Sequence, residues 1–214
     1  MTKVLGIGGG AGVGKTTLAS FLREKGIAVL ELDELARTLA QKGGPLWKQV
    51  VKVFGRSFLD RDGYLNRKKL GRVAFRNWKI LFVLNEVSHP LLLQEAKKWL
   101  QRKKNEALVG IEGAVLFEGG FLNLIDWVIF VDADSEVCTQ RLQAKGWTEK
   151  DTRDLLLAQR FLPCLRRRAN LILGNQNSLE RLHGEAEFIL RKFVGKPGNR
   201  SGSFSVVSDG EERR

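Results

Sequence analysis

The stretch that decides the fold is residues 3–17, KVLGIGGGAGVGKTT. Its first six residues are mostly apolar and predict a short buried strand, and the residues after the glycines predict a helix that ends near Gly26. Between them, Gly9 to Thr16 match the pattern G-x-x-x-x-G-K-[ST]. In this pattern, backbone N–H groups curl around nucleotide phosphates, the lysine reaches the outer phosphates and the hydroxyl binds magnesium. Because the match lies between a predicted strand and a predicted helix, we favour this interpretation over a glycine-rich turn without a ligand.

This P-loop predicts the residues that bind ATP and magnesium. Lys15 is the predicted cation on the outer phosphates, and the Thr16 hydroxyl is the predicted magnesium ligand. A P-loop indicates phosphate binding but does not by itself specify the reaction. The residues expected around the nucleotide phosphates are Gly10, Ala11, Gly12, Val13, Gly14, Lys15, Thr16 and Thr17.

Strands and helices alternate along the rest of the chain. Short apolar runs predict further strands at 27–32, 107–111, 127–131 and 171–173. Helices are predicted in most of 34–104, from Asp134 or Ser135 to Gly146, and over about 178–194, with Pro90 opening one helix and Thr148 and Asp151 resembling a capping box. We therefore expect an α/β fold with the three layers of a P-loop NTPase: a mostly parallel five-stranded sheet covered on both faces, with a helical insert and a lid.

The predicted domain covers residues 1–194 and includes the insert at 34–104 and a lid region at about 141–168. Residues 195–214 are rich in Gly, Ser, Asn and charges and predict a disordered tail. Two cysteines are too few for a disulfide framework. The first strand follows the N-terminus directly, and no stretch approaches the roughly 18 apolar residues of a membrane helix. We therefore expect a soluble, cytoplasmic protein.

The formal net charge of +12 is unevenly distributed. Residues 42–104 carry 16 basic and 4 acidic side chains, an excess equal to that of the whole chain. Such a run is often a solvated helix face, but it could also form a basic wall that faces a polyanionic small substrate. Nucleic-acid binding is less favoured, because the segment has few aromatic residues on which bases could stack.

Three polar residues outside the P-loop are candidates for chemistry. Asp33 follows the second predicted strand, at the sheet edge where ligands bind in open α/β folds, and its carboxylate could accept a proton from an attacking hydroxyl. From its position alone, Asp33 could equally be the N-cap of a helix beginning at Glu34. Arg141 could close over the ATP phosphates as a lid cation, although a surface arginine is the simpler interpretation. His89, beside Pro90, is by itself more typical of a structural histidine.

The order and spacing of several motifs over residues 3–194 resemble the dephospho-CoA kinase family. Besides the P-loop, the matching segments are Glu31-Leu32-Asp33, Phe54-Gly55, Asp62-Gly63-Tyr64-Leu65-Asn66-Arg67, Leu70, Phe75, His89-Pro90-Leu91, Leu116-Phe117-Glu118, Arg141-Leu142, Ala158-Gln159 and Ala169 to Asn175. The sequence departs from the family pattern at Glu31, Ala114, Lys145-Gly146, Asn170 and Gly174.

This resemblance implies a reaction and roles for individual residues. The protein would transfer the γ-phosphoryl group of ATP, with magnesium, to the ribose 3′-hydroxyl of dephospho-coenzyme A, the last step of coenzyme A biosynthesis. Asp33 would be the base, Lys15 and Arg141 would stabilise the transferred group, and the insert would cover the acceptor. The resemblance also implies substrate contacts by Asp33, His89, Leu116 and Glu118, and a nucleotide contact by Asn175.

Two other functions stay open at this point. The departures at Glu31, Asn170 and Gly174 keep open another P-loop kinase that acts on a nucleotide or nucleoside. The basic charge keeps open a nucleotide-binding, nucleic-acid-associated protein without kinase activity. We expect a small-molecule substrate and neither a nucleic-acid nor a membrane partner, and the sequence does not specify an oligomeric state.

Overall fold

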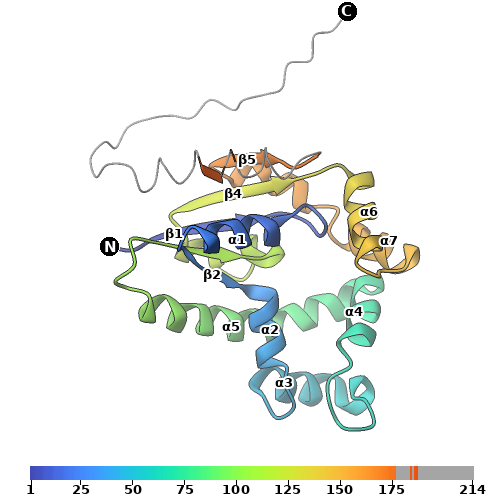
Figure 1. The fold of residues 1–214 in the computed structure, drawn as a ribbon. Helices are drawn as coiled ribbons and strands as arrows, with labels where there is room; N and C mark the ends of the chain where they lie inside the picture. The colour runs from blue at the N-terminus through green and yellow to red at the C-terminus, as the bar shows by residue number, and fades with distance from the viewer. Residues whose placement is uncertain (177–183, 185, 188–214) are drawn as a thin grey trace, which may run out of the picture.

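The computed structural model describes residues 1–176, 184, 186 and 187. At its centre is a parallel five-stranded sheet with the strand order β2-β3-β1-β4-β5 (Figure 1). All five predicted strands are confirmed, and no strand end differs from its prediction by more than one residue. The predicted tail and most of the predicted helix at 178–194 lie outside the described residues. The strands are β1 (Lys3–Gly8), β2 (Ala28–Glu31), β3 (Leu108–Glu112), β4 (Trp127–Asp132) and β5 (Leu171–Gly174).

Helices cover both faces of this sheet, which confirms the predicted three layers. Successive strand residues point to opposite faces. On β1, Leu5 belongs to a core cluster with residues of α1 (Lys15–Glu24) and α6 (Ser135–Ala144). The adjacent Val4 belongs to a second cluster, which contains residues of α5 (Trp78–Arg102). The carboxyl ends of the strands therefore form one edge between two helical layers, and ligands bind at this edge in open α/β folds.

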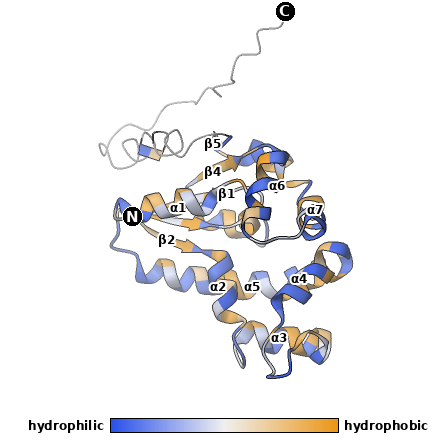
Figure 2. Cartoon of the chain, turned by 45° about the vertical axis from the view of Figure 1, so that its right-hand side comes forward, coloured by the Kyte–Doolittle hydropathy of each residue, from blue (hydrophilic) through white to orange (hydrophobic). Residues whose placement is uncertain are grey.

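The predicted helical insert connects β2 to β3. It consists of α2 (Leu32–Leu39), α3 (Pro45–Phe54), α4 (Arg67–Arg76) and α5, and α2 to α4 project below the sheet in Figure 1. The segment after β4 forms α6 and α7 (Glu149–Ala158). In Figure 2 the strands are mostly hydrophobic, whereas α4 is mostly hydrophilic. Short 3-10 helices are η1 (Gly55–Phe58), η2 (Ala114–Phe117), η3 (Phe121–Leu124) and η4 (Leu162–Arg168).

The prediction that Pro90 opens a helix is wrong, because Pro90 lies in the interior of α5. The true start is marked by Asn77, whose Oδ1 accepts hydrogen bonds from the N–H groups of Lys79 and Ile80 at 3.1 and 3.4 Å. A proline removes one helical hydrogen bond and crowds the preceding turn. Here the helix continues because its second half buries Leu92 and Ala96 in the core. Tertiary packing outweighs the local preference.

Of two predicted helix caps, the structure contains one and not the other. At the start of α7, Thr148 Oγ1 accepts a hydrogen bond from the Asp151 N–H at 3.1 Å, which confirms the Thr148 half of the predicted capping box. The Asp151 carboxylate instead accepts hydrogen bonds from Arg72 and Arg76. The alternative role of Asp33 as an N-cap is wrong, because α2 begins one residue before it and Glu31 occupies the N-cap position. Asp33 is therefore a helical residue in the first turn, directly after β2.

Candidate active site

The loop between β1 and α1 has a backbone that only glycine adopts easily. Gly9, Gly12 and Gly14 have φ angles of 137°, 79° and 102°. A Cβ at Gly9 would overlap the carbonyl oxygen of Val131. Gly14 is the N-cap of α1 and has no side chain to occupy the first N–H groups of the helix, which leaves them open to an anion.

Lys15 directs its ammonium group back over this loop. Its Nζ donates a hydrogen bond to the Gly10 carbonyl at 2.8 Å and lies 3.8 Å from Glu112 Oε1. Burial lowers the pKa of Lys15, and the negative charges of Glu112 and Asp33 oppose that effect. The cation is thus held in place above the loop before any phosphate is bound.

Glu112 is a functional candidate that the sequence analysis missed. It ends β3, and only 2% of its surface is exposed. Burial raises the pKa of Glu112 to about 7; Lys15 lowers it, while Asp33 raises it. A lone acid at the end of a buried strand next to the P-loop strand was the available signal, because neighbouring parallel strands end at the same edge.

Asp33 completes this group from the carboxyl end of β2. Its charge acts on both Lys15 and Glu112. Glu112 ends the neighbouring strand β3, and Lys15 begins α1 after the loop that follows β1, the next strand in the order β2-β3-β1. The side chain is exposed and makes no hydrogen bond or salt bridge within the described part of the chain. Its carboxylate is therefore available to a ligand.

Arg141 and Asn175 lie beside the P-loop on the β4–β5 side. Arg141 Nη1 donates to the carbonyls of Gly12 and Val13 at 3.3 and 3.4 Å, and its Nη2 donates to Asn175 Oδ1 at 3.5 Å. Asn175 is buried and its Nδ2 donates to the Val13 carbonyl at 2.8 Å. Both side chains support the loop from α6 and from the residue after β5.

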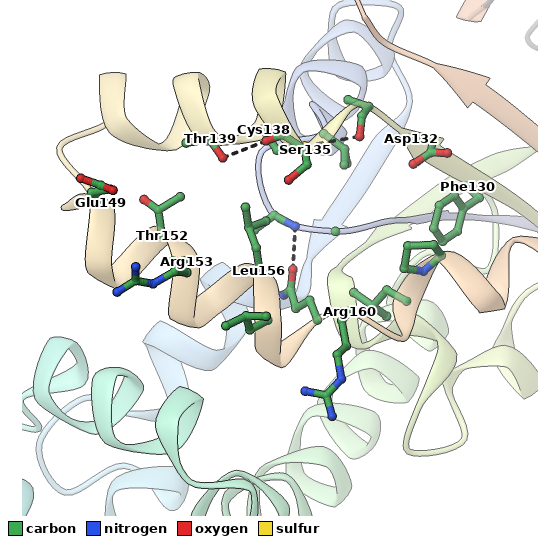
Figure 3. Close-up of a pocket in the computed structure, with 18 residues that line it drawn as sticks. Phe130, Asp132, Ser135, Cys138, Thr139, Glu149, Thr152, Arg153, Leu156 and Arg160 are labelled. Atoms are coloured by element: carbon green, nitrogen blue, oxygen red, sulfur yellow. Dashed lines mark hydrogen bonds between the residues drawn. The ribbon is translucent and has the colours of Figure 1, made fainter.

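Gln159 contacts the P-loop from the other side, and the sequence analysis gave it no role. This residue is the C-cap of α7, and its Oε1 accepts the Ala11 N–H at 2.8 Å. Both residues line a cavity of about 570 Å³, to which the P-loop, α6 and α7 contribute residues; Figure 3 draws the residues that line it. Thr152 also lines the cavity, and its buried Oγ1 has no hydrogen-bond partner among the described residues.

The predicted substrate residues His89 and Glu118 lie together, away from the direct contacts of Lys15. His89 Nε2 is 4.0 Å from Glu118 Oε2, which also accepts a hydrogen bond from Asn85 Nδ2 at 3.2 Å. Burial lowers the pKa of His89 and raises that of Glu118. Leu116 is fully buried in the core, so in this structure it supports the site and does not line it.

Comparison with known proteins identifies the family. The family model described as dephospho-CoA kinase matches residues 3–181. The chain belongs to the dephospho-CoA kinase family. A dephospho-CoA kinase of Aquifex aeolicus is 31% identical over 195 residues, which cover 91% of this chain and 100% of that protein. One of Carboxydothermus hydrogenoformans is 30% identical over 198 residues, which cover 90% and 95%.

Solved structures agree with the fold of this family. TT1252 from Thermus thermophilus is 29% identical, with a TM-score of 0.74 and coverage of 91% of this chain and 99% of that chain. Dephospho-CoA kinase from Campylobacter jejuni has a TM-score of 0.62 at 20% identity, with the same coverage. A shikimate kinase from Acinetobacter baumannii has a TM-score of 0.51 at 18% identity and covers 91% and 94%. The last two show the fold alone.

Two departures from the dephospho-CoA kinase pattern have structural explanations. Glu31 pairs with Arg23, with its Oε1 2.6 Å from Nη2. Asn170 Oδ1 accepts the Val128 N–H at 2.8 Å, so this side chain aligns β5 beside β4.

Among the described residues, no helix combines the length and apolar character needed to cross a bilayer.

The residues around the P-loop have the chemistry to hold a magnesium ion. Thr16 is exposed in the first turn of α1, next to Lys15. Hydroxyl and carboxylate oxygens are the ligands that magnesium prefers, together with water and substrate phosphates. Thr16, with Glu112 and Asp33 near Lys15, therefore supplies a suitable donor set, although the described residues hold no cluster of three acidic, His or Cys ligands.

We expect Glu112 to make the stability of the ligand-free protein depend on pH. The folded state keeps this proton up to about pH 7, whereas an ordinary glutamate releases it near 4.5. The folded state therefore binds more protons in this window, and the contribution of Glu112 to stability is lost as the pH rises through 7. The free energy of unfolding, measured with urea between pH 5 and pH 8, should fall by a value on the order of 2 kcal/mol. Glu112→Gln should remove most of this pH dependence, whereas Glu24→Gln, at an exposed position, should leave it unchanged. An equal decline in the Glu112 variant would contradict this assignment.

Proposed function

We propose that this protein transfers the γ-phosphoryl group of ATP to the ribose 3′-hydroxyl of dephospho-coenzyme A, the last step of coenzyme A biosynthesis. The observation that carries the proposal is the juxtaposition of Lys15, Asp33 and Glu112 beside a complete P-loop. A phosphate-binding cation and an unpaired carboxylate are the two groups that phosphoryl transfer to a hydroxyl requires. Family membership supplies the identity of the acceptor.

In the proposed mechanism, the loop from Gly10 to Thr17 binds the ATP phosphates through its N–H groups, and Lys15 binds the outer phosphates. Magnesium, when bound at Thr16, would neutralise charge on those phosphates. Asp33 accepts the proton of the 3′-hydroxyl as that oxygen attacks. Arg141 holds the carbonyls of Gly12 and Val13, so its support for the proposed nucleotide site includes fixing the loop.

We assign the acceptor to the side of the insert, residues 34–104, and the lid role to about 141–168. Asp33, His89 and Glu118 are the proposed acceptor contacts, and Asn175 belongs to the proposed nucleotide site. The basic excess of the insert supports an anionic acceptor, since dephospho-coenzyme A carries a pyrophosphate. One of these cations, Arg67, lies close enough to the proposed base for the charge of Asp33 to act on it. Burial and the Arg37 guanidinium lower the pKa of Arg67, and Asp33 and Glu34 raise it.

We expect Arg67→Gln to raise the KM for dephospho-coenzyme A about tenfold or more, because a charged hydrogen bond to the acceptor pyrophosphate is lost. The KM for ATP should change by less than about twofold, since Lys15 and the P-loop are untouched. Steady-state kinetics with each substrate varied would measure both values. Arg61→Gln, an exposed charge in the same insert, is the matched control. Equal increases in both KM values would exclude a specific acceptor contact.

A panel of acceptors tests the proposed reaction directly. Purified protein, ATP and magnesium would be incubated with dephospho-coenzyme A, nucleosides, nucleoside monophosphates or shikimate, and products would be identified by mass spectrometry. We expect efficient phosphorylation of dephospho-coenzyme A alone, with the new phosphate on the 3′-oxygen. Preferred phosphorylation of a nucleoside or nucleotide would replace this proposal with a different small-molecule kinase.

A further inference from the structure

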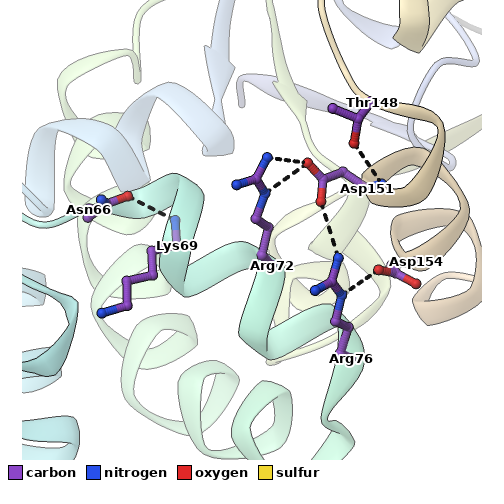
Figure 4. Close-up of polar contacts among 7 residues, drawn as sticks. All are labelled: Asn66, Lys69, Arg72, Arg76, Thr148, Asp151 and Asp154. Atoms are coloured by element: carbon purple, nitrogen blue, oxygen red, sulfur yellow. Dashed lines mark hydrogen bonds and ion pairs between the residues drawn. The ribbon is translucent and has the colours of Figure 1, made fainter.

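The insert and the segment after β4 are joined by a cluster of ion pairs between α4 and α7. Arg72 binds Asp151 Oδ2 through Nε at 2.8 Å and through Nη2 at 2.7 Å. Arg76 Nη2 lies 3.5 Å from Asp151 Oδ1, and its Nε lies 2.5 Å from Asp154 Oδ2. Figure 4 shows both arginines of α4 directed at the two acids of α7. We call these four residues the α4–α7 link.

The link is a network and not a set of isolated surface pairs. Only 9% of the Asp151 side chain and 19% of that of Asp154 are exposed. Asp151 also lies in the capped first turn of α7, because Thr148 Oγ1 accepts its N–H. The hydrogen bond from Arg72 is the main influence that lowers the pKa of Asp151, so the carboxylate is charged at neutral pH. The arginine side chains are 41% and 42% exposed, so the support comes from several charges joined in one network around two largely buried acids.

The other end of α7 contacts the P-loop. Gln159, the C-cap of α7, accepts the Ala11 N–H, and it follows Asp154 by five residues along the chain. At 1.5 Å per helical residue, the two contacts are separated by only about 8 to 12 Å of helix. The two contacts therefore lie on one uninterrupted helix of ten residues and its C-cap.

We propose that α7 is a positioning helix that couples the acceptor-covering insert to the P-loop. The α4–α7 link holds the N-terminal part of α7. At the C-terminal end of α7, Gln159 accepts the hydrogen bond of the Ala11 N–H and fixes its position. Binding of the acceptor against the insert then alters the geometry of the P-loop and changes its affinity for ATP. By linkage, ATP changes the affinity for the acceptor by the same factor. The identity of the acceptor rests on the proposed function, whereas the mechanical link does not.

Amide hydrogen exchange of Ala11 in the ligand-free protein tests the link without any acceptor. Gln159→Met removes the oxygen that accepts this N–H and should accelerate its exchange about fivefold or more. Arg72→Gln combined with Arg76→Gln should also accelerate it, although neither residue touches the P-loop. Lys150→Gln, an exposed charge on the same helix without an ion pair among the described residues, should leave it unchanged. Unchanged exchange in a folded Arg72/Arg76 variant overturns the proposal whatever the substrate is.

Binding measurements then test the coupling. The dissociation constant of a non-hydrolysable ATP analogue with magnesium would be measured with and without dephospho-coenzyme A. We expect the acceptor to change the dissociation constant of the ATP analogue about fivefold or more in the wild type. In the Arg72/Arg76 and Gln159 variants the change should be less than about twofold. Asp154→Asn, a milder change that removes one pair, should give an intermediate ratio and serves if the double variant does not fold. A ratio near one in a wild-type protein that binds dephospho-coenzyme A, or a full ratio in folded link variants, overturns the coupling.

Failure of the proposed function would give a different result. If dephospho-coenzyme A is not the acceptor, it will neither bind nor be phosphorylated, while Ala11 exchange will still respond to Arg72→Gln and Arg76→Gln. If dephospho-coenzyme A is phosphorylated, but the link substitutions change neither the Ala11 exchange rate nor the ratio of ATP-analogue dissociation constants, only the coupling is wrong.

Discussion

Replacing Lys15 by alanine should reduce phosphoryl transfer by at least about 10²-fold, the typical loss when one preorganised stabiliser of transition-state charge is removed. The structure gives a reason for preorganisation. The ammonium group is already anchored on the Gly10 carbonyl and faces Glu112, so it needs little rearrangement when phosphates bind. Single-turnover measurements with saturating dephospho-coenzyme A would isolate the transfer step.

The folding of the Lys15 variant must be checked, because Glu112 would lose its buried counter-charge. Its raised pKa allows the carboxyl group to become neutral near pH 7, which limits the penalty. We therefore expect a folded protein with a circular dichroism spectrum like that of the wild type. Lys15→Arg is the matched control: it keeps the charge, but a planar guanidinium does not reproduce the position of the ammonium. A folded alanine variant with near-full turnover would show that the P-loop lysine does not act in the chemistry.

The sequence predicted the sheet well because buried parallel strands carry a strong signal. The apolar runs around Leu5, Val109 and Ile129 have few alternatives to a buried strand, and the length of each run matches that of the observed strand within one residue. The P-loop was equally clear, since its glycines and Lys15 form one contiguous motif. Both features are local, and local features are the ones that a single sequence specifies.

Three of the errors and omissions involve contacts between distant segments. Pro90 has a local preference for the start of a helix, but burial of Leu92 and Ala96 keeps α5 continuous. Gln159 reaches the P-loop across 148 positions of sequence, which no local pattern encodes. Arg72 and Arg76 belong to the basic excess predicted to face a substrate or solvent, yet they pair with Asp151 and Asp154 about 75 to 79 positions away. Charge counts do not show which cations already have partners.

Glu112 illustrates a signal that was present but unused. The apolar run that predicts β3 ends at Ile111, one residue before the acid. Adjacent parallel strands end at one edge, so the residue after the strand paired with β1 must lie near Lys15. Applying that rule to every predicted strand end would have placed Glu112 beside Asp33.

Replacing Asp33 by asparagine should lower turnover by about 10²- to 10⁴-fold, the usual contribution of a general base, while ATP affinity changes little. The sequence left two roles for Asp33, and the structure removes one, because Glu31 and not Asp33 occupies the N-cap of α2. The remaining structural role is a favourable charge in the first helical turn, worth about 0.3–1 kcal/mol of helix stability. Such a contribution affects folding and not the transfer step.

Glu34→Gln separates these two explanations within the same turn of α2. It removes a first-turn negative charge, as Asp33→Asn does, but Glu34 pairs with Arg37 and is not among the groups that act on Lys15. We expect the Glu34 variant to keep wild-type kcat and the Asp33 variant to lose it, with similar thermal midpoints and similar ATP dissociation constants. Raising the pH should not rescue Asp33→Asn, because no carboxylate remains to be deprotonated. If both variants turn over equally, Asp33 acts through helix stability and the proton leaves the 3′-hydroxyl by another route.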